Sequence, residues 1–139
     1  MHPDRGERSA GDGARPAPDP GTVEVAVRDT DDGVAVVAVA GDVDGAAAAT
    51  LRAGVERAAT DARAVVLDLD DVALLASAGM TLLLEITEDL RGRGVPVLLA
   101  SQARTVRRPL RITGLDRVLT LHDDVASARA AAGDGADHG

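Results

Sequence analysis

The stretch at 65–86, VVLDLDDVALLASAGMTLLLEI, sets two apolar runs on either side of a short cluster of small residues. The first run, AVVLDL at 64–69, is short and continuous, which is typical of a strand buried in a parallel sheet. The second run has helical spacing, with the stripe formed by Met80, Leu83, Leu84, Thr87 and Leu90. This part of the chain therefore predicts a strand, a tight loop and a helix in immediate succession.

Hydrophobic patterns on both sides of this unit predict further strands and helices. Strands are expected at 22–29, 33–40, 95–100 and 117–122, and helices at 44–59, 103–113 and 123–132. The pair Asp32-Gly33 is a turn signal for a hairpin between the first two strands. Pro109 interrupts the helix at 103–113, so we expect a kink there or a helix that restarts near Arg108.

The order of these elements is ββαβαβαβα, which predicts an α/β fold. Strands that alternate with helices give a mostly parallel sheet, here of about five strands, and the leading hairpin makes the sheet mixed. Residues 22–132 form a single domain of this kind. The Pro- and Gly-rich segment 1–21 and the segment 133–139 are expected to be disordered tails.

The composition argues against several classes of function. The net charge is −8, which disfavours a nucleic-acid partner, and the absence of aromatic residues removes any platform for stacking bases. There is no Cys, and His2, His122 and His138 are too scattered to form a metal site. No segment resembles a signal peptide or a membrane span, so we expect a cytoplasmic protein without membrane insertion and without cofactors.

Known catalytic motifs are also missing. The chain has no Lys for a phosphate-binding loop or for a phospho-accepting receiver domain, and the segment LASAG has Ala in place of the first Gly of a nucleophile elbow. A carboxylate site could be drawn from Asp42, Asp44, Asp68, Asp70 and Asp71. The simpler interpretation is that these acids cap helices and line loops. We therefore predict that the protein is not an enzyme.

Ser77 is the only hydroxyl in the cluster of small residues, and two roles fit it. Ser is among the best N-cap residues, because its oxygen accepts a hydrogen bond from a free N–H of the first helical turn. A phosphoserine at the same position would face those N–H groups and the positive end of the helix dipole. Local sequence leaves both roles open.

Three segments together resemble the STAS domain, in particular the anti-sigma-factor antagonists. The first is Gly41-Asp42-Val43-Asp44 at the end of the second predicted strand, and the second is the unit at 65–86. The third is VRRPLRITGLDRVLTLHDD, with a closing helix, a Thr-Gly-Leu-Asp turn and a last strand. The resemblance spans about 41 to 124, and it implies a single STAS-like domain.

The resemblance implies a switch that is operated by partner proteins. An unphosphorylated antagonist binds an anti-sigma factor, which is a serine kinase of the GHKL ATPase type, and thereby releases a sigma factor. The kinase ends this complex by phosphorylating the antagonist on a Ser that corresponds to Ser77, and a serine phosphatase resets it. The implied partner-binding surface comprises Asp42, Asp44, Ala76, Ser77, Ala78, Gly79 and Met80.

One departure from the family pattern bears on the switch. The family has Asp where this chain has Ala76, so the carboxylate beside the acceptor Ser is lost. This favours an alternative, in which the domain is never phosphorylated and acts as a scaffold in a signalling assembly or as the cytoplasmic partner of a membrane transporter.

Overall fold

The computed structural model describes residues 21–138, except for the side chains of 29–31 and 133–138. Its elements, in chain order, are β1 (Val23–Asp31), β2 (Val34–Val43), the 3-10 turn η1 (Gly45–Ala47), α2 (Ala48–Ala59), β3 (Ala64–Leu75), α3 (Ser77–Gly92), β4 (Val97–Ala100), α4 (Arg104–Thr113), the 3-10 turn η2 (Leu115–Arg117), β5 (Leu121–His122) and α5 (Val125–His138). This order confirms the predicted α/β class and the succession ββαβαβαβα. Apart from Gly21, the expected N-terminal tail lies outside the described residues.

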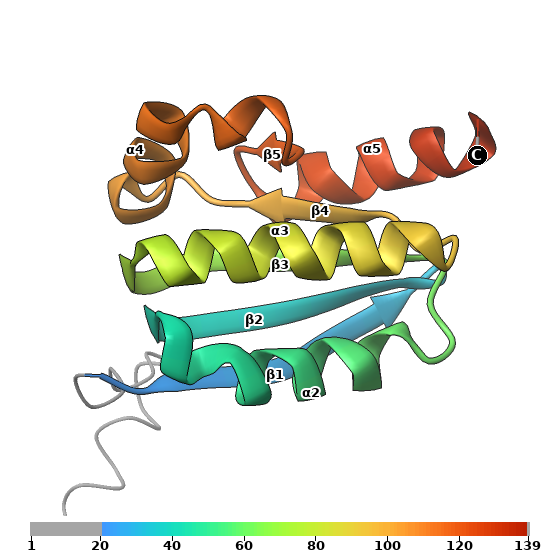
Figure 1. Ribbon diagram of the computed structural model, residues 1–139. Coiled ribbons are helices and arrows are strands. Elements are labelled where there is room, and N and C mark those ends of the chain that lie inside the picture. The colour runs from blue at the N-terminus through green and yellow to red at the C-terminus, as the bar shows by residue number, and fades with distance from the viewer. Residues whose placement is uncertain (1–20, 139) are drawn as a thin grey trace, which may run out of the picture.

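The five strands form one mixed sheet in the order β1-β2-β3-β4-β5 (Figure 1). β1 and β2 are antiparallel, whereas β2, β3, β4 and β5 run parallel to one another. The predicted hairpin is present, and its two central residues, Asp32 and Gly33, have φ of 59° and 79°. Positive φ at both positions matches the twist of the flanking strands, which explains the Asp-Gly pair.

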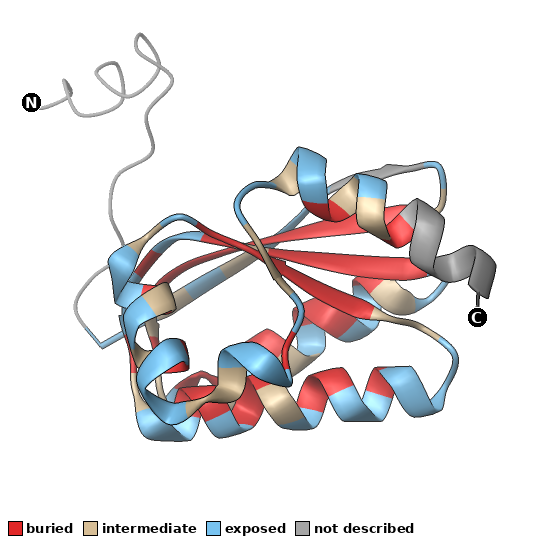
Figure 2. Ribbon diagram, turned by 90° about the horizontal axis from the view of Figure 1, so that it is seen from above, coloured by how far each residue is buried: buried red, intermediate tan, exposed pale blue. Residues whose placement is uncertain are grey.

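Helices cover both faces of the sheet, and the two faces differ in size. α2, α3 and α4 enclose the larger core, which contains the side chains Val37, Leu51, Leu67, Leu83, Leu99 and Leu110. α5 covers the other face through Ala128 and Ala132, over Val36, Val66 and Leu98. In Figure 2 the buried strands lie between the helix that ends at the C-terminus and the remaining helices. Alternate residues of β2, β3 and β4 thus serve different cores, as strand geometry requires.

Two strands differ in length from the prediction: β3 is longer and β5 is shorter. β3 continues to Leu75, six residues beyond the predicted end at Leu69. Two acidic residues of β3 are tolerated because they have partners on neighbouring segments. Asp68 pairs with Arg28 of β1 at 2.7 Å, and Asp70 accepts a hydrogen bond from the Gln102 N–H, just after β4, at 2.9 Å. In contrast, β5 is only Leu121–His122, because Arg117 belongs to η2 and residues 118–120 form a turn and a bend before the strand begins.

Two helices also differ from expectation. α5 continues to His138, beyond residue 132, where we expected the folded part to end. α4 runs through Pro109 as one helix and does not restart near Arg108. Val106 and Leu110, on either side of the proline, are both buried, and the Thr113 hydroxyl donates to the Pro109 carbonyl at 2.8 Å. Packing therefore holds the helix together across the missing N–H.

Candidate functional site

Helix α3, which carries Ser77, begins one residue too early for Ser77 to be its N-cap. Ala76 is the N-cap of α3, with extended backbone at φ −83° and ψ 169°, and Ser77 is the first helical residue. Of the two roles that the local sequence left open for Ser77, the cap is therefore excluded. No side chain caps the start of α3, and the Met80 N–H donates to the Ala76 carbonyl at 2.9 Å as the first bond of the helix.

The start of α3 is fixed by the end of β2 instead of by a cap. The Ala76 N–H donates to the Val43 carbonyl at 3.0 Å. Gly79 is buried against the same peptide unit, so that a Cβ on Gly79 would collide with the Val43 carbonyl oxygen and lie 2.8 Å from its carbon. Only glycine permits this approach, which explains the Gly at the loop-helix junction in physical terms.

Two acidic residues, Asp42 and Asp44, flank Val43 at the end of β2. The Asp44 carboxylate accepts from the Ala46 N–H at 3.0 Å and caps η1. The next residue, Gly45, faces the Ala78 methyl, because a Cβ on Gly45 would lie 3.6 Å from it. Asp42 has another task, since its carboxylate accepts from the Gly21 N–H at 2.7 Å and fixes the approach to β1.

The predicted partner-binding residues divide into an outer and an inner group. Ser77 and Ala78 are exposed, and Asp42, Asp44 and Ala76 are partly exposed. Gly79 and Met80 are buried, and Met80 belongs to the larger core. Met80 therefore lies beneath the partner-binding surface to which the sequence analysis assigned it. Its sulfur is 3.7 Å from the Thr113 hydroxyl at the end of α4.

The chemistry of this site is that of an exposed hydroxyl at an open helix start. The first N–H groups of a helix have no intrahelical acceptors, and they form the positive end of its dipole. An anion on Ser77 would meet this partial positive charge. Among the described residues, no His or carboxylate is hydrogen-bonded to the Ser77 hydroxyl, so the activated geometry of a serine nucleophile is not present there.

Three residues of the site were missed by the sequence analysis. Val43 supplies the carbonyl against which Gly79 lies, Gly45 faces Ala78, and Thr113 contacts Met80. Each contact joins segments that are more than 30 residues apart. Only the Gly at position 79 gave a signal, because a glycine inside an otherwise helical pattern often indicates a close backbone approach.

Comparison with known proteins agrees with this architecture. The sequence profile of the STAS domain matches residues 26–128. The structure is similar to that of an anti-sigma factor antagonist from Mycobacterium paratuberculosis, with 31% sequence identity, a TM-score of 0.72, and coverage of 82% of this chain and 97% of that chain.

Two more distant structures share the fold. The Bacillus cell fate determinant SpoIIAA in its phosphorylated form is 15% identical, with a TM-score of 0.57, over 78% of this chain and 99% of that chain. A sulfate transporter family protein from Wolinella succinogenes is 21% identical, with a TM-score of 0.64, over 76% of this chain and 88% of that chain. In the part of the chain that the structure describes, no helix is long and apolar enough to cross a membrane. The matched profile covers most of the chain, and the chain therefore belongs to the STAS domain family.

Proposed function

We propose that this protein is an anti-sigma-factor antagonist, which binds an anti-sigma factor to release a sigma factor. The similarity to the mycobacterial antagonist, at 31% identity over nearly the whole of that chain, supports this proposal. The outer residues of the site, Asp44, Ser77 and Ala78, form the centre of the proposed binding surface. In this proposal the chain binds its partner and does not itself catalyse a reaction.

We further propose that the anti-sigma factor is a serine kinase of the GHKL type and that it phosphorylates Ser77, while a serine phosphatase resets the switch. The observation that carries this proposal is the exposed Ser77 hydroxyl at a helix start without a side-chain cap. A phosphate at this position adds nearly two negative charges where the helix dipole favours them, so the fold is expected to tolerate it. The new charge and bulk would instead alter the surface that the partner contacts and so weaken binding.

Intact mass spectrometry after incubation with the cognate anti-sigma kinase and ATP tests the proposal. We expect the mass of one phosphate on the wild-type chain and on Thr81→Ala, but not on Ser77→Ala. Thr81 is a matched control because it is an exposed hydroxyl one turn further along α3. An unmodified wild-type chain, or equal modification of Ser77→Ala, contradicts the phosphorylation switch.

A second candidate function follows from Ala76. The methyl group at the N-cap of α3 removes a carboxylate that the family pattern places beside the acceptor, and the fold is also found in a sulfate transporter family protein. In this alternative the domain is a scaffold that stays unphosphorylated, or the cytoplasmic partner of a transporter. Affinity purification with the full chain as bait discriminates, since recovery of transporter subunits in place of a GHKL kinase favours the alternative.

A further inference from the structure

The exposed face of α4 carries a concentration of positive charge in an acidic protein. Five of the fifteen basic residues lie between 104 and 117, where Asp116 is the only acidic residue. Arg104, Arg108 and Arg111 are spaced by four and three residues, so they share one face of the helix. This face points away from the core, because the opposite side carries the buried Val106 and Leu110.

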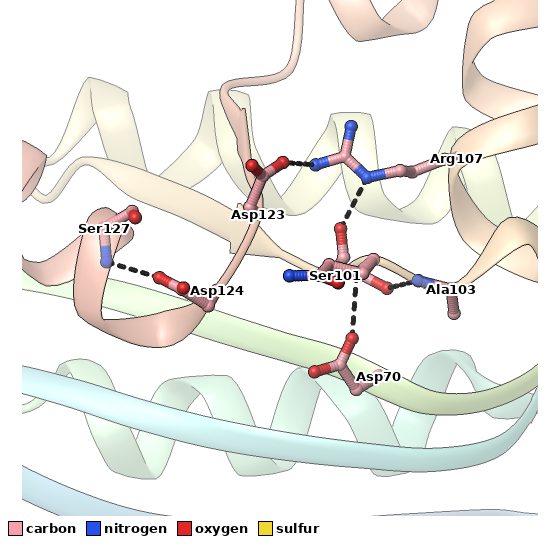
Figure 3. A network of polar contacts seen from close by, with 8 residues as sticks. Asp70, Ser101, Ala103, Arg107, Asp123, Asp124 and Ser127 are labelled. Atoms are coloured by element: carbon pink, nitrogen blue, oxygen red, sulfur yellow. Dashed lines mark hydrogen bonds and ion pairs between the residues drawn. The ribbon is translucent and has the colours of Figure 1, made fainter.

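Only one arginine of this helix has a structural task that the contacts reveal. Arg107 donates to the Ser101 carbonyl at 2.7 Å and pairs with Asp123 at 2.6 Å, which fixes α4 to the ends of β4 and β5 (Figure 3). Among the described residues, Arg104, Arg108 and Arg111 have neither an ion pair nor a hydrogen bond through their side chains. Within the part of the chain that the structure describes, their charges are therefore not compensated by a direct contact.

Two of these three arginines are placed unfavourably for the helix itself, whereas Arg111 lies in the last turn, where a cation suits the dipole. Arg104 lies in the first turn, where the dipole disfavours cations, and Arg108 has like charges three and four residues away. Pro109 adds the loss of a backbone hydrogen bond. Natural sequences break such local rules mainly at functional sites.

The helix that carries this basic face lies beside the segment that leads to Ser77, where the Thr105 hydroxyl donates to the Val72 carbonyl at 2.7 Å. The end of α4 contacts the first turn of α3, with the Thr113 hydroxyl 3.7 Å from the Met80 sulfur. Figure 1 shows α4 at the end of the sheet where α3 begins. Ile112, beside Thr113, is 69% exposed and is the most exposed large apolar side chain described. A partner that covers Ser77 can therefore extend onto α4.

We propose that Arg104, Arg108, Arg111 and Ile112 form a second contact area for the anti-sigma factor, which presents an acidic surface to them. This inference rests on the proposed function. It adds that the antagonist is recognised through two neighbouring areas of different chemistry, an uncharged loop that holds Ser77 and a basic helix. Complementary charges of this kind mainly accelerate association and fix the orientation of the partner, with an apolar side chain at the edge.

Titration of the cognate anti-sigma factor with full-length variants, at low and at high salt, tests the inference. We expect Arg108→Gln/Arg111→Gln to weaken binding on the order of tenfold at low salt, mainly through slower association, and to reduce the salt dependence. The double variant Arg57→Gln/Arg91→Gln removes the same net charge from the last turns of α2 and α3 and is expected to change the affinity less than about twofold. Ile112→Ser should weaken binding at both salt concentrations, because its contact is not electrostatic.

The outcomes separate the inference from the function on which it rests. If Ser77→Glu weakens binding but Arg108→Gln/Arg111→Gln binds as tightly as the wild type, the antagonist function holds and the second contact area is wrong. If the wild type does not bind the anti-sigma factor at all, both fail. Binding of duplex DNA or anionic vesicles through Arg108 and Arg111, with the affinity for the anti-sigma factor unchanged by their loss, also overturns the inference.

Discussion

The starts of α3 and α5 both follow a strand of the same sheet, yet they are stabilised in different ways. At α5 the Asp124 carboxylate accepts from the Ser127 N–H at 2.7 Å, so the helix supplies its own acceptor. At α3 the corresponding residue is Ala76, and the helix is held by the contact of Gly79 with β2. A helix start that is fixed by packing can leave its N–H groups open toward the surface. This combination is compatible with the phosphorylation of Ser77 that we propose.

The largest expected effect tests the packing at the start of α3. Gly79→Ala should lower the free energy of unfolding by about 3 kcal/mol, because the added methyl collides with the Val43 carbonyl. Urea denaturation of the two proteins measures the difference. Gly92→Ala is the matched control in the same helix: nothing lies within 4 Å of its Cβ, and we expect stabilisation of about 0.5 kcal/mol. Equal effects of the two substitutions would show that β2 does not fix the start of α3.

A smaller effect is expected when α3 receives the cap that α5 already has. Ala76→Asp should raise the free energy of unfolding by about 1 kcal/mol, since Ala76 has the extended backbone in which a carboxylate can accept from the first turn. The control Ala78→Asp places the same charge two residues later, where it gains only about 0.3 kcal/mol from the dipole. Thermal or urea denaturation of both variants and the wild type measures the two changes in stability. A gain from Ala78→Asp as large as that from Ala76→Asp would contradict capping as the cause.

The smallest expected effect concerns the pH dependence of the capped helix. The hydrogen bonds from Ser127, and secondarily the nearby His122, hold the pKa of Asp124 below its ordinary value of 3.8. A carboxylate with a lowered pKa in the folded state stabilises the protein above 3.8, and this contribution is lost as the pH falls through the folded pKa. At neutral pH we expect Asp124→Asn to have a lower free energy of unfolding than the wild type. This difference should become slightly smaller in acid.

Urea denaturation of both proteins between neutral and acidic pH makes that comparison. Asp61→Asn, in the loop before β3, is the control for the loss of one carboxylate elsewhere. Parallel curves for the wild type and Asp124→Asn over the whole range would show that this cap does not contribute through its charge.

Much of the fold could be predicted because the core is built from regular patterns. The runs of Val, Ala and Leu mark the strands, and Gly114, with φ of 78°, ends α4 where the sequence analysis placed the end. The full length of β3 could not be predicted. Its second half contains Asp70 and Asp71 in place of an apolar run, and the Gln102 N–H, which makes Asp70 acceptable here, lies 32 residues away.

The candidate site was predictable in composition but not in geometry. The sequence identified Ser77, Asp44 and Gly79 as neighbours of functional interest, and the structure places them at one junction. The sequence alone could not show that α3 begins after Ala76, because this start depends on the hydrogen bond from the Ala76 N–H to the Val43 carbonyl. Met80 is a different case: the resemblance placed it on the partner-binding surface, whereas the helical spacing had placed it on the apolar stripe with Leu83 and Leu90, and the structure buries it in the larger core.

The manner in which α5 covers the sheet has a consequence for slow motions of the domain. Among its described side chains, the buried ones are the methyl groups of Ala128 and Ala132, with Val125 and Ala131 partly buried at the margin, so this part of the helix buries little apolar area. Elements with few buried apolar contacts open locally at a lower free energy than the global unfolding transition. We expect the amide hydrogens of α5 to exchange with solvent well before those of β2 and β3, so that one side of the sheet is the part of this domain that opens first.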